Sequence, residues 1–194
     1  MRERIVLTFF VAALAAVCSA GAASVRGTAN GMPGGPPTQK AKAGTPPATV
    51  CNVDAYVLDP DPKGLNVRDA PGVEGRVVAV IPLDADGTNV HLTAASPNGW
   101  VQIDRAETIM GAVVFDKKGW VSGNMLGIMT RGYEGRGVKL YDRPRARKAA
   151  GKLPSEDEVK VAGCEGDWMR VKYKSVSGWL APADQCSSPV TTCN

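Results

Sequence analysis

Short segments with alternating apolar and polar residues recur along the chain from about residue 51, and no segment shows a strong helical period. Val53, Ala55 and Val57 alternate with Asn52, Asp54 and Tyr56, the pattern of a strand with one buried face. Further short apolar or alternating segments are bounded by turn-forming Gly, Pro, Asn and Asp: Leu65–Arg68, Val77–Ile81, Asn89–Leu92, Trp100–Ile103 and Gly119–Val121. Several short strands with regular turns predict an all-β fold, either a small barrel or a sandwich.

The strand pattern contains an internal repeat, in which three landmarks recur in the same order. In the first copy they are Gly64–Pro71, Gly99–Ile103 and Gly119–Val121; in the second they are Gly137–Pro144, Asp167–Val171 and Gly178–Leu180. The two tryptophans lie 20 residues apart in the first copy and 11 apart in the second. We therefore predict a longer hairpin near Arg105–Asp116, since surface loops tolerate insertions at small cost.

The opening landmark of the first copy is similar to that of bacterial Src homology 3 domains. The similarity lies in Leu65-Asn66-Val67-Arg68-Asp69-Ala70-Pro71-Gly72 and in the Gly-Trp strands that follow. The second copy is degenerate, with Lys139 in place of the asparagine and Tyr141 in place of the arginine. The resemblance implies two tandem SH3-like β-barrels of five or six strands, at residues 51–130 and 131–194.

The N-terminal segment has the features of an export signal. Arg2 and Arg4 precede the apolar run Ile5–Val17, and Ala20-Gly21-Ala22 offers a small-residue cleavage site, so residues 1–22 predict a signal peptide. A retained membrane anchor is one alternative. Lipidation at Cys18 is another, although a small residue rather than valine is expected before a lipidated cysteine.

The segment between the predicted signal peptide and the first copy has a distinct composition. The chain holds 22 Gly and 14 Pro, and residues 23–50 are especially rich in both, which predicts a disordered linker. Cleavage after residue 22 would lower the formal net charge from +4 to +3. Such modest basicity favours contact with anionic polymers without indicating nucleic-acid binding.

Four cysteines follow the predicted signal peptide: Cys51, Cys164, Cys186 and Cys193. An even number in an exported protein predicts two disulfide bonds, and the sequence leaves three pairings open. The short loop favours Cys186–Cys193, which leaves Cys51–Cys164 by elimination. Zinc is the alternative, but no pair has C-x-x-C spacing and the only histidine is distant, so neither a metal nor a cofactor is expected.

Catalytic groups are scarce in the sequence. His91 lies in a predicted strand, where a structural or surface role is expected, and no G-x-S-x-G motif surrounds a serine such as Ser96 or Ser155. Asp84-Ala85-Asp86-Gly87 resembles the start of a calcium loop, but Ala95 stands where a later acidic ligand is required. These features predict a protein that is not an enzyme.

Ligand binding is the better supported activity. Strand-borne tryptophans form shallow platforms for peptides or glycans, with burial in the core as the alternative. Two charged residues of the first copy lie at the loop that the resemblance makes part of a groove, with pairing to each other or to solvent as the alternative. The candidate ligand-binding residues are Arg68, Asp69, Trp100, Trp120, Arg143, Trp168 and Trp179.

A basic segment in the second copy is a further candidate. Between Arg131 and Lys152 lie eight Lys or Arg residues and two acids, a net charge of +6. Such density attracts anionic polymers, whereas solvated loop charge is the alternative. Its densest part is the cluster Arg143, Arg145, Arg147 and Lys148.

The sequence therefore predicts a non-catalytic secreted or periplasmic envelope protein that binds peptidoglycan or a peptide ligand through SH3-like barrels. A periplasmic adaptor that binds another envelope protein is the alternative. Nucleic acid is not an expected partner, because it fits the charge but not the predicted compartment.

Overall fold

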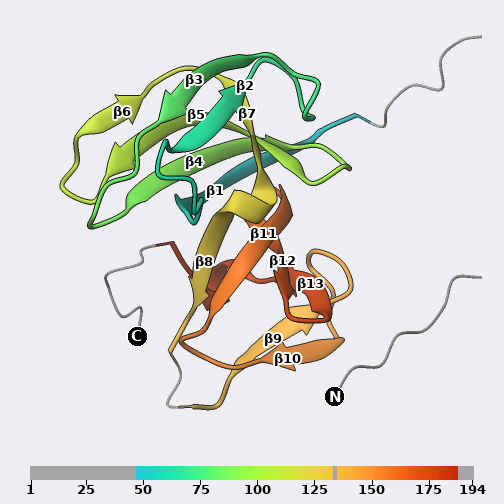
Figure 1. Cartoon of the computed structure of the whole chain (residues 1–194). Coiled ribbons are helices and arrows are strands. Elements are labelled where there is room, and N and C mark those ends of the chain that lie inside the picture. The colour runs from blue at the N-terminus through green and yellow to red at the C-terminus, as the bar shows by residue number, and fades with distance from the viewer. Residues whose placement is uncertain (1–46, 133–134, 188–194) are drawn as a thin grey trace, which may run out of the picture. The chain divides into compact units, whose positions relative to one another are not determined.

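Strands dominate the computed structural model, which describes residues 47–132 and 135–187. Within these ranges the chain forms fourteen strands and two single-turn 3-10 helices (Figure 1). In chain order they are β1 (Thr49–Val57), β2 (Leu65–Arg68), β3 (Val77–Ile81), β4 (Thr88–Ala95), β5 (Trp100–Thr108), β6 (Val113–Phe115), β7 (Gly119–Ser122), η1 (Gly123–Met125), β8 (Leu126–Thr130), β9 (Val138–Tyr141), β10 (Gly151–Leu153), β11 (Glu158–Glu165), β12 (Trp168–Tyr173), β13 (Val176–Leu180), η2 (Pro182–Asp184) and β14 (Gln185–Cys186). The all-β prediction is confirmed.

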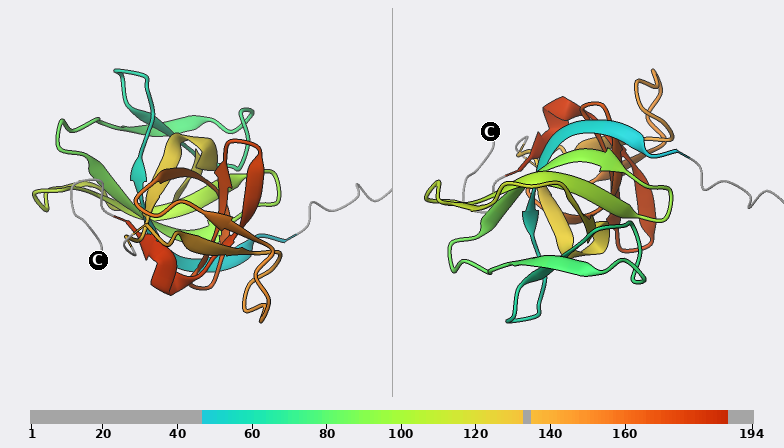
Figure 2. Two further views of the ribbon diagram at one scale, coloured as in Figure 1. Left: turned by 90° about the horizontal axis from the view of Figure 1, so that it is seen from below. Right: turned by 90° about the horizontal axis from the view of Figure 1, so that it is seen from above.

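All the named strands belong to one antiparallel sheet. Its order is β10-β9-β13-β12-β11-β8-β1-β4-β5-β7-β2-β3, with β14 pairing with β8 and β6 pairing with β5. Figure 2 shows β1 lying along β4, one of the longest pairings of the sheet. The described residues fall in one compact unit.

The strand order repeats outward from the central pair β1–β8. On one side β1 is followed by β4, β5, β7, β2 and β3; on the other side β8 is followed by β11, β12, β13, β9 and β10. Counterparts carry the landmarks of the sequence repeat, because the opening segment lies in β2 and β9 and the tryptophans lie in β5, β7, β12 and β13. We call β1–β8 the first copy and β8–β14 the second copy, with β8 common to both; their division into two separate barrels remains a prediction.

Strand β8 serves both copies. It follows β7 and η1, as β14 follows β13 and η2, and it pairs with β1 as β14 pairs with β8. It also pairs with β11, as β1 pairs with β4. The same strand is therefore the last strand of the first copy and the first strand of the second.

The core follows the alternation of the strands. β2 buries Leu65 and Val67, and its counterpart β9 buries Val138 and Leu140. The buried side chains form one cluster that draws on both copies and includes Ile128 of the shared strand. The prediction from alternation is wrong at Tyr56. The sequence grouped Tyr56 with the outward-facing polar residues of β1, but only 2% of its surface is exposed.

The predicted insertion in the first copy is a hairpin. β5 continues to Thr108 and pairs with β6, with Ala106 opposite Phe115. In the second copy β12 ends at Tyr173 and β13 begins at Val176, so a short turn replaces the hairpin. The extra residues therefore add β6, which pairs with β5 outside the main strand order, and leave the repeated strands in place.

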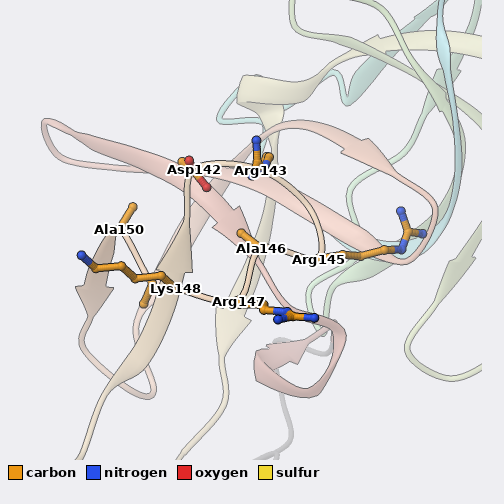
Figure 3. A pocket seen from close by; sticks show the side chains of 8 residues that line it. Asp142, Arg143, Arg145, Ala146, Arg147, Lys148 and Ala150 are labelled. Atoms are coloured by element: carbon orange, nitrogen blue, oxygen red, sulfur yellow. The ribbon is translucent and has the colours of Figure 1, made fainter.

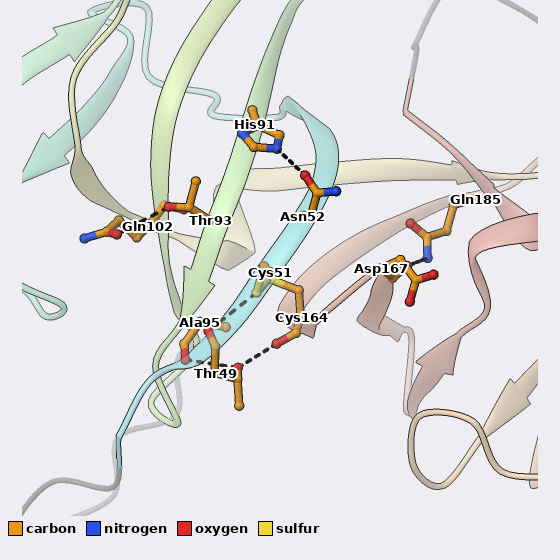
Figure 4. The surroundings of a disulfide bond; sticks show 10 residues. All are labelled: Thr49, Cys51, Asn52, His91, Thr93, Ala95, Gln102, Cys164, Asp167 and Gln185. Atoms are coloured by element: carbon orange, nitrogen blue, oxygen red, sulfur yellow. Dashed lines mark hydrogen bonds between the residues drawn. A yellow bond between two sulfur atoms is a disulfide. The ribbon is translucent and has the colours of Figure 1, made fainter.

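A disulfide bond joins the two copies. Cys51 of β1 and Cys164 of β11 are linked, with Cα atoms 5.6 Å apart and a sequence separation of 113 (Figure 4). The Thr49 hydroxyl donates to the Cys164 carbonyl at 2.6 Å, and the Asn52 backbone amide donates to the Gly166 carbonyl at 2.8 Å. The predicted Cys51–Cys164 pairing is confirmed, and a buried disulfide indicates an oxidising, non-cytoplasmic compartment.

Tyr56 makes a second link between the copies. Its hydroxyl donates to a Glu158 carboxylate oxygen at 3.2 Å, from β1 to β11. Burial, together with the nearby carboxylate, raises the pKa of Tyr56 above its usual range, so the phenol stays protonated.

Several sequence predictions fall outside the described residues. The signal peptide (1–22), Cys18 and Cys193 lie there, as does the predicted linker 23–50 up to residue 46; Thr49 and Val50, at its end, already belong to β1. Cys186 is disulfide-bonded, whereas its predicted partner Cys193 is not among the described residues. In the described part of the chain, no helix is long and apolar enough to cross a membrane.

Candidate functional site

All four tryptophans lie on the face of the sheet opposite the core. Each is half-buried and is followed by a fully buried residue of the same strand, such as Val101 after Trp100 and Leu180 after Trp179. Successive side chains of a strand point to opposite faces, so the tryptophans point outward. We call this side of each copy its outer face.

In the first copy, three predicted residues meet on the outer face. Arg68 at the end of β2 lies opposite Trp120 of β7, and Trp120 lies opposite Gln102 of β5. The Arg68 guanidinium carbon lies 5.9 Å from the centre of the Trp100 ring, within range of a cation–π interaction. Arg68, Trp100 and Trp120 form what we call the first aromatic site.

The loop after β2 is held beside this site by hydrogen bonds. One guanidinium nitrogen of Arg68 donates to the Val73 carbonyl at 3.1 Å and to the Gly75 carbonyl at 2.6 Å. The Asn98 side-chain amide donates to the Pro71 carbonyl at 3.0 Å, which ties the loop to the turn before Trp100. Arg68 therefore shapes the loop as well as contacting an indole.

Asp69, predicted as a ligand-binding residue, has a local structural partner. Its carboxylate accepts a hydrogen bond from the Arg76 backbone amide at 2.8 Å and lies 3.3 Å from the Arg76 guanidinium. Both side chains are exposed, so the ion pair contributes little to stability. The alternative pairing of Asp69 with Arg68 is not formed; Asp69 instead closes the loop through Arg76.

The second copy repeats this arrangement with a tyrosine in place of the arginine. Tyr141 lies opposite Trp179, and its ring packs edge-on against Trp168 with centroids 5.3 Å apart at 81°. Tyr141, Trp168 and Trp179 form the second aromatic site. Tyr141 was not predicted as a site residue, although the sequence repeat aligns it with Arg68.

A trough runs past the second aromatic site. One hollow of about 120 Å³ is lined by Trp179, Arg170 and Pro97, and a larger one of about 380 Å³ shares Arg170 and Pro97 and continues to Ser177. Pro97 belongs to the turn before Trp100, so the trough is bordered by both copies. An extended ligand would find polar, cationic and aromatic side chains along one path.

The predicted basic cluster lines a hollow of about 660 Å³ in the loop between β9 and β10 (Figure 3). Arg145 lies 3.6 Å from Glu165 and 4.0 Å from Asp167, which ties the loop to the turn between β11 and β12. Arg143, Arg147 and Lys148 have no acidic partner within ion-pair distance among the described residues. Arg145 therefore has two acidic neighbours, whereas the other three charges have none and remain available to an anion.

His91 is held on the surface by two polar side chains. Its Nε2 lies 3.1 Å from the Asn52 side-chain amide oxygen (Figure 4). Its Nδ1 lies 2.8 Å from an Asp104 carboxylate oxygen. Both ring nitrogens are thus occupied, and no described cysteine or serine is hydrogen-bonded to either. The Asp84–Gly87 segment forms a turn, and the described residues contain no group of three or more side chains suited to a metal ion.

Comparisons with known proteins identify no family. No family model and no curated protein matches the chain. Two solved structures from Trichomonas vaginalis are similar at a TM-score of 0.30: NlpC2, with 15% identity over 74% of this chain, and NlpC1, with 16% identity over 69%. The matches cover 51% and 45% of those chains, so this chain spans about half their length.

Proposed function

We propose that this protein is a non-catalytic secreted envelope protein that binds peptidoglycan or a peptide ligand through its two aromatic sites. Two tandem SH3-like barrels, as the resemblance to bacterial Src homology 3 domains implies, form part of this proposal. The sites are Arg68, Trp100 and Trp120 in the first copy and Tyr141, Trp168 and Trp179 in the second.

One observation carries the proposal: four half-exposed tryptophans occupy matching outer-face positions. A tryptophan used only for stability gains most from full burial, because stabilisation grows with the apolar area removed from water. Partly exposed indoles instead offer a large, rigid contact area at low entropic cost. The trough beside Trp179 adds a concave path for an extended ligand.

The absence of an assembled nucleophile supports a non-catalytic role. Cys51 and Cys164 are linked to each other, and both nitrogens of His91 face polar oxygens. A nucleophile needs a base within hydrogen-bond reach. Within the described residues, none of these groups is so placed.

Sedimentation with purified sacculi tests the wall-binding proposal. We expect the protein to pellet with sacculi at low ionic strength, and Trp100→Ala and Trp179→Ala each to weaken binding at least about tenfold, as for buried aromatic anchors at interfaces. The control is Met110→Ala, which removes an 83% exposed apolar side chain from the turn between β5 and β6. Failure of the wild type to pellet, or tryptophan variants that pellet like wild type while folded, would refute wall binding through these sites.

A second candidate function, a protein-interaction adaptor, is favoured by strand β3. It ends the sheet order, so one edge has no strand partner in the described part of the chain, and Val78 is 47% exposed on it. Val77 and Val80 are also exposed, and β3 carries no charge. An exposed apolar edge accepts an additional strand from another chain.

The adaptor function predicts one dominant protein partner that survives wall digestion in affinity capture from an envelope extract. Val78→Lys should abolish its capture, since a charge on an edge strand opposes strand addition. Met110→Ala again serves as the control. Recovery of the same partner by the Val78→Lys protein would exclude β3 as the docking edge.

A further inference from the structure

The outer faces of the two copies differ in charge at equivalent positions. In the first copy Asn66 and Val80 lie opposite each other on β2 and β3; in the second copy Lys139 and Lys152 occupy the matching places on β9 and β10. Likewise Gln102 and Asp104 of β5 correspond to Arg170 and Lys172 of β12. At a fifth matched position the first copy carries the cation, Arg68, and the second copy carries the neutral Tyr141. The side chains at these five positions therefore sum to no net charge in the first copy and to +4 in the second.

The four second-copy cations are close to other cations and have no acidic partners among the described residues. All four are exposed, and none has an acidic side chain within ion-pair distance among the described residues. Lys139 lies directly opposite Lys152, and Lys160 of β11 lies directly opposite Lys172. Like charges in direct cross-strand pairs are destabilising, and an anion placed across them would relieve the repulsion.

The aromatic site lies within this charged surface. Along the sheet, Tyr141 of β9 lies opposite Trp179 of β13, which lies opposite Arg170 of β12. The cations extend from β10 to β11, four strand spacings or roughly 19 Å at about 4.8 Å each. A single small anion cannot span this distance, whereas a polymer with repeated acidic groups can.

From this arrangement we infer that the outer face of the second copy, defined by Tyr141, Trp168, Trp179, Lys139, Lys152, Lys160, Arg170 and Lys172, binds an acidic polysaccharide. The aromatic rings pack against the apolar C–H faces of sugar rings, and the lysines and Arg170 contact carboxylate or phosphate groups along the chain. The inference deepens the proposed function and rests on its assignment of the second aromatic site as a ligand surface. The first copy, neutral at the same positions, does not share this ligand class.

A sugar polymer fits the surroundings better than a nucleic acid. Aromatic rings interleaved with cations also bind single-stranded nucleic acids. However, the Cys51–Cys164 disulfide indicates an oxidising compartment, whereas disulfides are rare in the cytosol and the nucleus, where nucleic acids are concentrated. Single-stranded DNA therefore enters the experiment as a competing ligand.

The test exchanges the charged residues of the second copy for their first-copy counterparts. The exchange variant carries Lys139→Asn, Lys152→Val, Arg170→Gln and Lys172→Asp, which neutralises three cations and reverses one. The control variant carries Lys63→Asn, Lys117→Asp and Lys118→Asp in exposed loops of the first copy, which neutralises one cation and reverses two. Both variants therefore lose the same formal charge, and thermal melting checks that each is folded.

Binding is measured with polygalacturonate for carboxylate, dextran phosphate for phosphate, and methyl-esterified polygalacturonate and neutral dextran as uncharged counterparts. We expect at least one acidic polymer to bind wild type and control within about twofold of each other, the exchange variant at least about tenfold more weakly, and the uncharged polymers weakly or not at all. The more strongly bound acidic polymer identifies the anion.

Four results would overturn the inference: no binding of either acidic polymer to the wild type, equal weakening in the control and exchange variants, equal binding of the uncharged polymers, or single-stranded DNA bound more tightly than either acidic polymer. Sacculus binding is a separate readout. If sacculi do not bind but an acidic polymer binds as expected, wall binding fails and this inference stands. If sacculi bind the wild type but the acidic polymers bind wild type and exchange variant equally, only this inference fails.

Discussion

Replacing Cys51 with alanine should lower the free energy of unfolding by about 4 to 5 kcal/mol, because the lost disulfide closes a loop longer than 100 residues in the unfolded chain. The bond also joins β1 of the first copy to β11 of the second, so its loss removes a direct restraint between the copies. Urea denaturation followed by tryptophan fluorescence measures the effect without reducing the other disulfide-bonded cysteine, Cys186.

A double-mutant comparison separates the cross-link from simple loss of volume. The bond is already broken in the Cys51→Ala protein, so adding Cys164→Ala should cost only about 1 kcal/mol more, the scale of a small cavity. Equal, additive losses for the two substitutions would mean that packing of the sulfur atoms, and not the cross-link, provides the stabilisation.

Replacing Ile128 with alanine should lower the free energy of unfolding by about 3 kcal/mol and destabilise both copies together. The loss follows from removing a fully buried side chain from the core. Because Ile128 lies on β8, which pairs with both β1 and β11, its truncation weakens a strand that the two copies share.

Two tryptophan backgrounds report the copies separately. Trp168→Phe with Trp179→Phe leaves the first-copy indoles as the fluorescent probes, and Trp100→Phe with Trp120→Phe leaves the second-copy indoles. The Ile128→Ala substitution should shift the urea midpoint equally in both backgrounds, whereas Val113→Ala on the exposed strand β6 should change either by no more than about 0.5 kcal/mol. A shift confined to one background would show that the copies unfold independently.

The candidate site was only partly predictable from sequence. The sequence repeat places Trp100, Trp120, Trp168 and Trp179 at matching positions of two sets of strands, as the structure shows, but it could not predict their burial. Their role in ligand binding stays a prediction. Arg68 was expected at a groove and instead divides its contacts between an indole and two loop carbonyls. Asp69 pairs with Arg76, a partner that becomes close only when the loop closes.

The cationic surface of the second copy was predicted only in part. Lys139 and Lys152 fall in the basic segment, but Lys160, Arg170 and Lys172 lie outside it. Charge density along the chain points to the loop around Arg143 rather than to these strands. Lys139, Lys160 and Lys172 are far apart in sequence and come together only through strand pairing. The alternation Trp168-x-Arg170-x-Lys172 was the available signal, since residues two apart on a strand share a face.

Sequence alone determined the features that depend on neighbouring residues: strands from period-two alternation, turns from Gly, Pro and Asp, the repeat from its landmarks, and the need for disulfides from cysteine number. Only the tertiary structure decided that β8 serves both copies, that Tyr56 is buried against Glu158, and that lysines of different strands lie opposite each other. Alternation fixes which side chains share a face of one strand, but the register between strands depends on the whole sheet and its core, which no local pattern specifies.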